Sequence, residues 1–395
     1  MRRLLWFLLG ILVVALAGSV TVLPRVVDAN MNRVERPTTP VRISEAARAL
    51  HARPRRAALH DDRLLWSLRD PLERHDRGQT DLPRLLAGNV ALQVFSTVSK
   101  TPRGMNYERN DAASDNITLL AITQRWPRAT WTSLYARAER AAHALDDAAA
   151  RSVGRLRVVR TRADLRDGLA ARARGEQVLL GTLSLEGLQV LEGRLDHVDS
   201  LYALGFRMAG LTHFFDNEVG GSAHGQTRGG LTPLGRDVIT RLEALGMLVD
   251  LAHASPALID DVLSMAKRPV VVSHTGVAAT CPGPRNLTDD QLRRIAATGG
   301  VVGIGYWDGA VCEITPASVA RAIVHAITVA GEDHVALGSD WDGAVTTTFD
   351  ASELVQVTEA LLAAGLPPST IAKVMGENVF ALLERSLPEG GAATP

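Results

Sequence analysis

Short apolar runs alternate with amphipathic segments along most of this chain, and polar residues directly follow several of the apolar runs. The clearest example extends from Leu245 to Gly276. There MLVDLA leads to His253, a helical segment follows from Ser255 to about Lys267, and PVVVS leads to His274. Parallel strands of a strand–helix–strand unit have their carboxyl ends on one side, about 4.8 Å apart if adjacent. The pattern therefore predicts two imidazoles close enough to hold one metal ion or two neighbouring ones.

The same alternation predicts about eight strands with helices between most of them. The expected strands are Ala57–Leu59, Val90–Val98, VLLGTLSLEG ending at Glu186-Gly187, RMAGLTH ending at His213, the runs before His253 and His274, Val301–Trp307, and HVALG before Ser339. The expected helices between and after them include Thr130–Arg151, Ala163–Arg174, Val198–Leu204, Thr288–Ala297, Pro316–Ala330, Ala351–Ala364 and Ser369–Leu387. Regular alternation without a fixed sequence repeat favours an α/β fold, a parallel (β/α)8 barrel of the TIM type.

The N-terminus carries an apolar run without charges, from Leu4 to Leu23. As a helix it would extend about 30 Å, enough to cross a bilayer. Arg2 and Arg3 precede the run, which favours a cytoplasmic N-terminus with the rest of the chain exported. The small residues around Ala15-Leu16-Ala17 resemble a signal-peptide cleavage site. Residues 1–24 are therefore either a signal anchor, a hydrophobic transmembrane helix ahead of the barrel, or a cleaved signal peptide. The protein is then either anchored to the cell membrane or secreted or periplasmic.

Beyond this run, residues 25–56 are expected to form a juxtamembrane connector with one short helix, Ser44–Leu50. Residues 57–388 are expected to form the barrel, and residues 389–395 a flexible tail. The 395 residues suffice for one large catalytic domain, and the net charge of zero gives no electrostatic footprint for nucleic acid. Cys281 and Cys312 could form one bridge, and the sequence leaves that open.

Polar residues at the expected strand ends suggest a metal site. In His60-x-Asp62 both side chains project from one face of a strand, since residues two apart point the same way. Glu186 ends an apolar strand, where a carboxylate is unfavourable unless it is paired or binds metal. With His253 and His274, these residues provide the imidazole and carboxylate ligands that suit two zinc ions. Two ions about 3.5–4 Å apart can lower the pKa of a bridging water and polarise a carbonyl, as amide or ester hydrolysis requires.

The order of short motifs carries a family resemblance. H-x-D, L-E-G, L-T-H, G-L-T-P-x-G, D-L-x-H, S-H, P-R-N-L-T-D and G-S-D-x-D-G follow one another between Leu59 and Leu387. This order resembles the membrane (renal-type) dipeptidase family, zinc metallopeptidase family M19. The resemblance implies a hydrolase that cleaves dipeptides, including D-amino-acid-containing ones, through a hydroxide bridging two Zn²⁺ ions. It also implies a homodimer.

The resemblance assigns metal-binding roles to five positions of this chain. His60 and Asp62 would bind the first zinc ion. His253 and His274 would bind the second. Glu186 would bridge the two ions and take part in catalysis.

It assigns catalytic or substrate-binding roles to three more residues. His213 would contact the substrate and help to stabilise the tetrahedral intermediate. Arg285 would hold the substrate's terminal carboxylate, as a guanidinium fork is suited to do. Asp340 would transfer protons or bind the substrate's amino group. For Arg285 the alternative is a structural ion pair that caps the helix before Thr288.

Two departures from the family pattern touch the expected pocket wall. The family's Gly-His-Asn-Asp is Leu59-His60-Asp61-Asp62 here, and its Gly-Gly-His after the bridging glutamate is Gly187-Leu188-Gln189. Neither removes a ligand, so they put substrate preference in doubt. One alternative function is a lactonase or phosphotriesterase of the amidohydrolase type, bridged by a carboxylated lysine such as Lys100. Another is a non-catalytic or narrowly specialised envelope relative.

Overall fold

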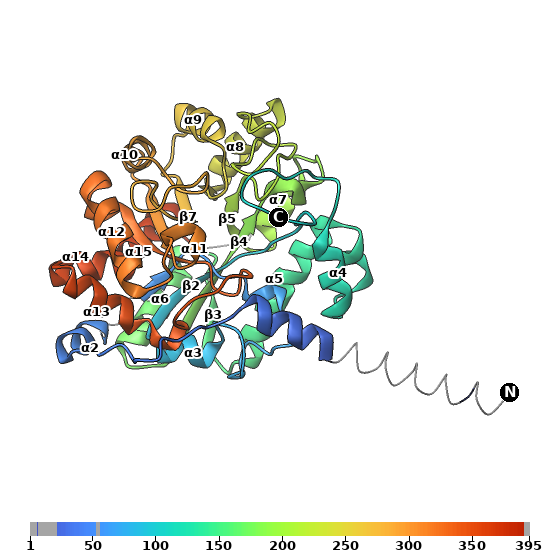
Figure 1. Ribbon diagram of the computed structural model, residues 1–395. Helices are drawn as coiled ribbons and strands as arrows, with labels where there is room; N and C mark the ends of the chain where they lie inside the picture. Colours follow the sequence, from blue (N-terminus) through green and yellow to red (C-terminus); the bar gives the residue numbers. More distant parts are fainter. Residues whose placement is uncertain (1–5, 7–21, 53–55, 391–395) are drawn as a thin grey trace.

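A closed parallel barrel forms the body of the protein in the computed structural model, which describes Trp6, residues 22–52 and residues 56–390 (Figure 1). Its strands are β1 (Arg56–Ala58), β2 (Val90–Phe95), β4 (Leu179–Glu186), β5 (Phe206–Gly210), β6 (Leu248–Asp250), β7 (Val271–Thr275), β8 (Val301–Gly305) and β9 (Val335–Ser339). Each pairs in parallel with its neighbours, and the pairs β2–β4 and β1–β9 close the ring. The predicted TIM-type barrel is confirmed.

The sequence pattern did not predict one further strand. Strand β3 (Leu156–Val158) pairs with the beginning of β4, where Leu156 lies opposite Leu179. It has only three residues, two of them half-buried, so its sequence carries no clear alternation. Strand β5 ends at Gly210, three residues earlier than expected, and β6 ends at Asp250, two residues before the end of the expected run at Ala252. His213 and His253 consequently lie in the loops that follow these strands.

Helices cover the outside of the barrel. They are α3 (Leu82–Ala87), α5 (Leu134–Arg151), α6 (Arg162–Ala173), α7 (His197–Ala203), α8 (Pro233–Leu245), α9 (Pro256–Met265), α10 (Asp289–Ala297), α12 (Pro316–Ala330), α13 (Val355–Ala363), α14 (Pro368–Ala372) and α15 (Asn378–Ser386). Helix α8 was not predicted, although Thr232 caps it and Pro233 occupies its first turn, a common way for a helix to begin. The single helix expected over Ser369–Leu387 is divided, with a π-helical turn, Lys373–Glu377, between α14 and α15.

The segment ahead of the barrel packs against it. Residues 22–31 are helical and lie beside α4 (Asn116–Thr123) in Figure 1, and Val27 packs in the same cluster as Leu120. Helix α2 (Glu45–His51) begins after Ser44, whose side chain caps it, and His51 reaches Thr358 at 2.8 Å. The expected connector therefore includes the short helix and makes specific contacts with the barrel.

Most of the apolar run Leu4–Leu23 lies outside the described residues, as does nearly all of the expected tail. Among the residues that the structure describes, no helix is both long and apolar enough to span a bilayer. The open question of the cysteines is answered by a disulfide between Cys281 and Cys312. It joins the loop after β7 to the end of α11 (Asp308–Val311).

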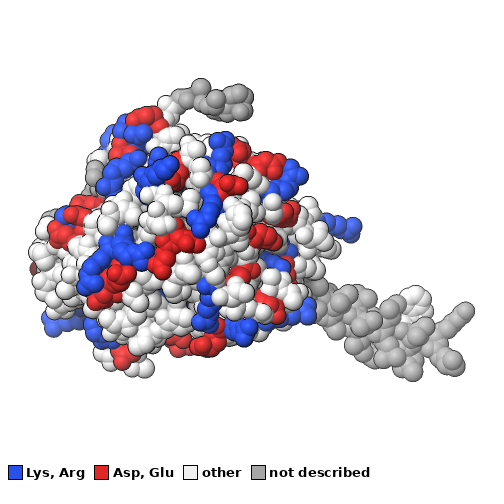
Figure 2. Space-filling view, turned by 90° about the horizontal axis from the view of Figure 1, so that it is seen from above, with Lys and Arg blue, Asp and Glu red and all other residues white. Residues whose placement is uncertain are grey.

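Acidic and basic side chains are interspersed on the face seen in Figure 2. Many oppositely charged side chains of the described residues pair with one another, as Arg294 does with Asp260 at 2.5 Å. The face in view therefore presents no field of a single sign.

Candidate metal centre

The predicted site residues meet at the carboxyl-terminal ends of the barrel strands. His60 and Asp62 follow β1, Glu186 is the last residue of β4, His274 lies in β7, and His253 follows β6. All five are at least 95% buried. His253 has a φ of 61°, an uncommon backbone conformation for a non-glycine residue, which observations in other proteins associate with functional sites.

One group of ligand atoms surrounds Oε1 of Glu186. His253 Nε2 lies 2.9 Å from this oxygen and 3.1 Å from His274 Nε2, and His274 Nε2 is 3.3 Å from the same oxygen. Ligands about 2.0 Å from a tetrahedral zinc ion would be about 3.3 Å from one another. The spacing of these three atoms therefore suits a single small cation.

A second group surrounds the other oxygen of Glu186. His60 Nε2 lies 3.6 Å from Glu186 Oε2 and 3.4 Å from Asp62 Oδ2. Both ring nitrogens of His60, Oδ1 of Asp62 and Oε2 of Glu186 are buried without a hydrogen-bond partner among the described residues. Buried polar atoms without partners are costly, so these atoms fit coordination of a cation. Two buried triads, Glu186–His213–His253 and His60–Asp62–Glu186, share Glu186, and His274 also groups with His60 and Asp340, so the cluster forms a binuclear-type metal site.

His213 and Asp340 lie beside these two groups. His213 Nε2 is 3.4 Å from Glu186 Oε1, and Asp340 Oδ1 is 3.7 Å from His60 Nε2. Each also belongs to a compact group of three potential ligands. Distance alone therefore does not separate a ligand role from a substrate-contacting role for either residue.

Burial and crowding of carboxylates dominate the electrostatics of the centre. Burial raises the pKa of Asp340 to about 7, with Asp62 raising it further and His60 opposing. Burial, reinforced by Asp62, also raises the pKa of Glu186 well above its ordinary value. For His60, burial lowers the pKa, but the carboxylates of Glu186, Asp62 and Asp340 outweigh it and raise the pKa to about 10. The carboxylates lack sufficient counter-charge, which a divalent cation would supply.

The imidazole of His213 is neutral at physiological pH. Burial lowers the pKa of His213 to about 3. Its Nδ1 lies 3.4 Å from the carbonyl oxygen of Lys100, a position from which that oxygen can accept a hydrogen bond. With Nδ1 protonated, Nε2 would be left as an acceptor or ligand atom.

Arg285 enters the centre from the loop after β7. Its guanidinium donates to the carbonyl oxygen of His274 at 2.7 Å and lies 5.5 Å from the ring centre of Trp307. Its Nε has no hydrogen-bond partner among the described residues. Helix α10 is capped by Thr288 and Gln291 instead, so the alternative of a helix-capping ion pair is wrong. The buried guanidinium is available to a ligand.

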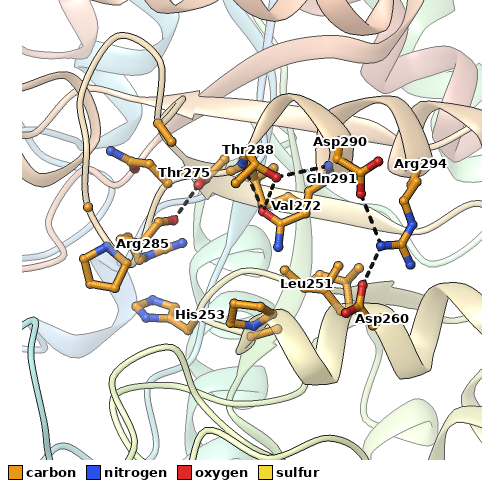
Figure 3. A pocket seen from close by; sticks show the side chains of 18 residues that line it. Leu251, His253, Asp260, Val272, Thr275, Arg285, Thr288, Asp290, Gln291 and Arg294 are labelled. Carbon is orange, nitrogen blue, oxygen red and sulfur yellow. Dashed lines mark hydrogen bonds and ion pairs between the residues drawn. The ribbon is translucent and has the colours of Figure 1, made fainter.

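Figure 3 shows the other side of His253, where a cavity of about 380 Å³ lies between α9 and α10. Arg294 reaches both Asp260 and Asp290 on its lining, and Thr275 donates to the carbonyl oxygen of Arg285. The Thr275 contact joins the Arg285 loop to the strand that carries His274, and the contact of Arg294 with Asp260 joins α10 to α9.

The residues that depart from the family pattern have structural partners. Asp61 accepts a hydrogen bond from the backbone N–H of Arg63 at 2.7 Å and one from Thr80. Gln189 donates to Ser99 at 2.9 Å, directly under Glu186. Both side chains brace the loops that carry ligands.

Two features of the site were missed in the sequence. A Cβ atom on Gly343 would lie 2.3 Å from Asp340 Oδ1 and 2.9 Å from Asp62 Oδ2, so only glycine leaves room there. Its place in the G-S-D-x-D-G motif was the available signal. Tyr107, whose hydroxyl is 2.9 Å from Trp307 Nε1, comes from a polar loop with no such signal.

Lys100 does not reach the centre. Its ammonium group donates to the carbonyl oxygen of Ala112 at 2.7 Å on the exposed side of the loop. The position between the two ligand groups belongs to Glu186. The alternative with a carboxylated lysine bridge is therefore wrong.

Replacing His253 with alanine is expected to remove about one metal equivalent per folded molecule, since the side chain belongs to only one group. Elemental analysis together with circular dichroism would measure both quantities. His224→Ala is the matched control, because His224 is also buried and its ring lies 5.7 Å from that of His253. Unchanged metal content in folded His253→Ala would contradict the ligand role.

Comparisons with known proteins agree with this geometry. Residues 44–386 match the family model of the membrane dipeptidases, peptidase family M19. The dipeptidase tcpJ of Claviceps purpurea is 29% identical over 320 residues, which cover 78% of this chain and 69% of that protein. An uncharacterized Klebsiella pneumoniae protein from the pqqA 5′ region is 35% identical over 250 residues, covering 60% of this chain and 90% of that protein.

A solved structure is similar over almost its whole length. It is a metallo peptidase from Rhodobacter sphaeroides liganded with a phosphinate mimic of the dipeptide L-Ala-D-Ala. It is 26% identical, has a TM-score of 0.68, and covers 84% of this chain and 99% of its own. The family match includes every residue of the metal centre, from His60 to Asp340. This chain is therefore a dipeptidase that belongs to the membrane dipeptidase family of metallopeptidases, peptidase family M19.

Proposed function

We propose that the centre binds two zinc ions and hydrolyses the peptide bond of dipeptides, including those with a carboxy-terminal D-residue. The observation that carries the proposal is the position of Glu186, whose two oxygens face two separate groups of ligands. His60 and Asp62 hold one ion with it, and His253 and His274 hold the other. Imidazole and carboxylate ligands suit zinc, which when bound supplies Lewis acidity and an activated water.

The other polar side chains bind and orient the substrate. Arg285 holds the terminal carboxylate, because its guanidinium is buried and retains a donor without a partner. His213 contacts the scissile carbonyl and stabilises the charge that develops on its oxygen. Asp340, whose Oδ1 lies 3.7 Å from His60 Nε2 beside the ligand groups, holds the amino group or transfers a proton to the leaving amine. The D-residue part of the proposal is supported by the similar Rhodobacter sphaeroides protein, whose structure is liganded with a phosphinate mimic of L-Ala-D-Ala.

Metal removal tests the proposal directly. The purified protein is expected to contain two zinc equivalents and to hydrolyse L-Ala-L-Ala and L-Ala-D-Ala. Dialysis against a chelator should abolish both activities, and added zinc should restore them. A folded protein that binds no metal and cleaves neither peptide would contradict the proposal. Hydrolysis of the L,L peptide alone would reject only its D-residue part.

We further propose that the domain works outside the cytoplasm. The disulfide Cys281–Cys312 suits an oxidising compartment, and the apolar run before residue 24 suits export as an anchor or signal peptide. Fractionation of cells that express the full chain would distinguish the anchored form from a released one. The homodimer implied by the family resemblance stays a prediction.

A further inference from the structure

An apolar cavity of about 360 Å³ extends from the metal centre to the helical residues 22–31. Its polar end contains Glu186 and Arg285. At its other end it is lined by Leu23, Val27 and Met31, and opposite them by Ile117, Leu119 and Leu120 of α4. Residues 22–31 precede the stretch matched by the family model, which begins at residue 44. This wall therefore lies outside the part of the chain that the family model describes.

Buried charges hold the wall in place. The carboxylate of Asp28, 1% exposed, pairs with Arg69 at 2.8 Å and with Arg77 at 3.0 Å. Arg69 also pairs with Asp342 at 2.9 Å, in the loop that carries Asp340. These ion pairs connect the N-terminal segment to the metal centre through a single buried arginine.

A backbone contact adds to this connection. The N–H of Ala344 donates to the side chain of Asn32 at 3.0 Å, and Asn32 in turn donates to Asp28 at 2.9 Å. Ala344 itself lines the cavity. The segment is thus built into the side of the pocket.

The two ends of the cavity lie across the barrel from each other. Arg285 follows β7, whereas Leu65 and Val98 of the apolar end follow β1 and β2. Strands β8 and β9 separate β7 from β1 on one side, and β4, β5 and β6 separate it from β2 on the other. A dipeptide whose carboxylate is bound at Arg285 would direct its amino-terminal residue towards the apolar end.

We propose that Leu23, Pro24, Val27 and Met31, the cavity-lining side chains of residues 22–31, form a specificity wall, which gives the enzyme a preference for dipeptides with a large apolar amino-terminal side chain. The proposal rests on the function proposed above, which supplies the orientation of the substrate. Leu23 is 51% exposed and Leu119 is 64% exposed, so a ligand can still cover apolar surface there. Each methylene group that a substrate buries there is expected to raise kcat/KM about fourfold. Val27, in contact with the cluster around Trp66, is the position best placed to report this contact.

A matched pair of variants tests the wall. Val27→Asp places a charge in the cavity, whereas Val26→Asp places the same charge on the adjacent side chain, which is 46% exposed and does not line the cavity. The measurement is the ratio of kcat/KM for L-Leu-L-Ala to that for L-Ala-L-Ala. Val27→Asp is expected to lower this ratio about tenfold or more, and Val26→Asp to leave it at the wild-type value.

A second variant and a binding measurement guard against misfolding. Val27→Ala keeps the wall apolar but shorter and should lower the ratio in the same direction by less. By calorimetry, the wild type should bind the phosphinate mimic with an amino-terminal leucine more tightly than the mimic with alanine. This difference in affinity should be smaller in Val27→Ala and smallest in Val27→Asp. If the ratio of kcat/KM for L-Leu-L-Ala to that for L-Ala-L-Ala is equal in the wild type and both Val27 variants, the proposed specificity wall is wrong.

Two other results are distinguishable from these. If the wild type is folded and metal-loaded but cleaves neither peptide, the proposed function is wrong. The affinities for the two phosphinate mimics, measured by calorimetry, then test the specificity wall alone. If Val27→Asp leaves the ratio unchanged but weakens binding to vesicles of anionic phospholipid, the apolar surface contacts a membrane instead. That outcome would also overturn the proposal.

Discussion

Replacing Glu186 with glutamine is expected to abolish metal binding at both groups and to lower kcat/KM by about 10³-fold or more. The large effect follows from geometry, because each group uses a different oxygen of this one side chain. An amide provides one neutral oxygen and one N–H₂ group, so it cannot bridge two cations. Elemental analysis and dipeptide hydrolysis would measure the two effects.

Glu218→Gln is the matched control for this experiment, since Glu218 is exposed and lies in the loop that follows His213. It should retain both metal equivalents and wild-type activity. If Glu186→Gln remained fully loaded and active, the shared carboxylate would not be a ligand, and the binuclear reading of the site would fail.

Replacing Arg69 with methionine is expected to lower the free energy of unfolding by about 3–5 kcal/mol. The guanidinium is fully buried between Asp28 and Asp342, so its loss would leave carboxylates in a low-dielectric interior without this counter-charge. Denaturant titration, followed by circular dichroism, would measure the change. The wall formed by residues 22–31 should loosen in the same variant, because Arg69 connects it to the loop of Asp340.

Two variants define how specific this effect is. Arg77→Met should lower the free energy of unfolding much less, because Arg77 is partly exposed and Asp28 would keep Arg69 as its partner. Adding Asp342→Asn to Arg69→Met should recover part of the loss, since it removes one of the unpaired charges. If Arg77→Met lowers the free energy of unfolding as much as Arg69→Met does, the destabilisation does not arise from the buried ion pairs. The same conclusion follows if the double variant is no more stable than Arg69→Met.

The pattern of apolar and polar positions predicts the barrel and brings the predicted metal ligands to one edge of it. Apolar runs of strand length, separated by amphipathic segments, specify local structure directly, and parallel strands must end on the same side. That rule sufficed to place His253 near His274, whose Nε2 atoms are 3.1 Å apart. The prediction is correct although β6 ends before His253, because the short turn after β6 keeps this histidine at the same edge of the barrel as His274.

Contacts between loops that lie far apart in the chain became visible only in the folded protein. The pairing of Arg69 with Asp28 and Asp342, the disulfide Cys281–Cys312 and the apolar wall of residues 22–31 all join segments that no local pattern connects. The physical reason is that hydrophobic periodicity reports which face of a segment is buried, not which segment covers it. The sequence therefore predicts which polar residues share one edge of the barrel, whereas the shape of the pocket above them depends on contacts between distant segments of the described chain.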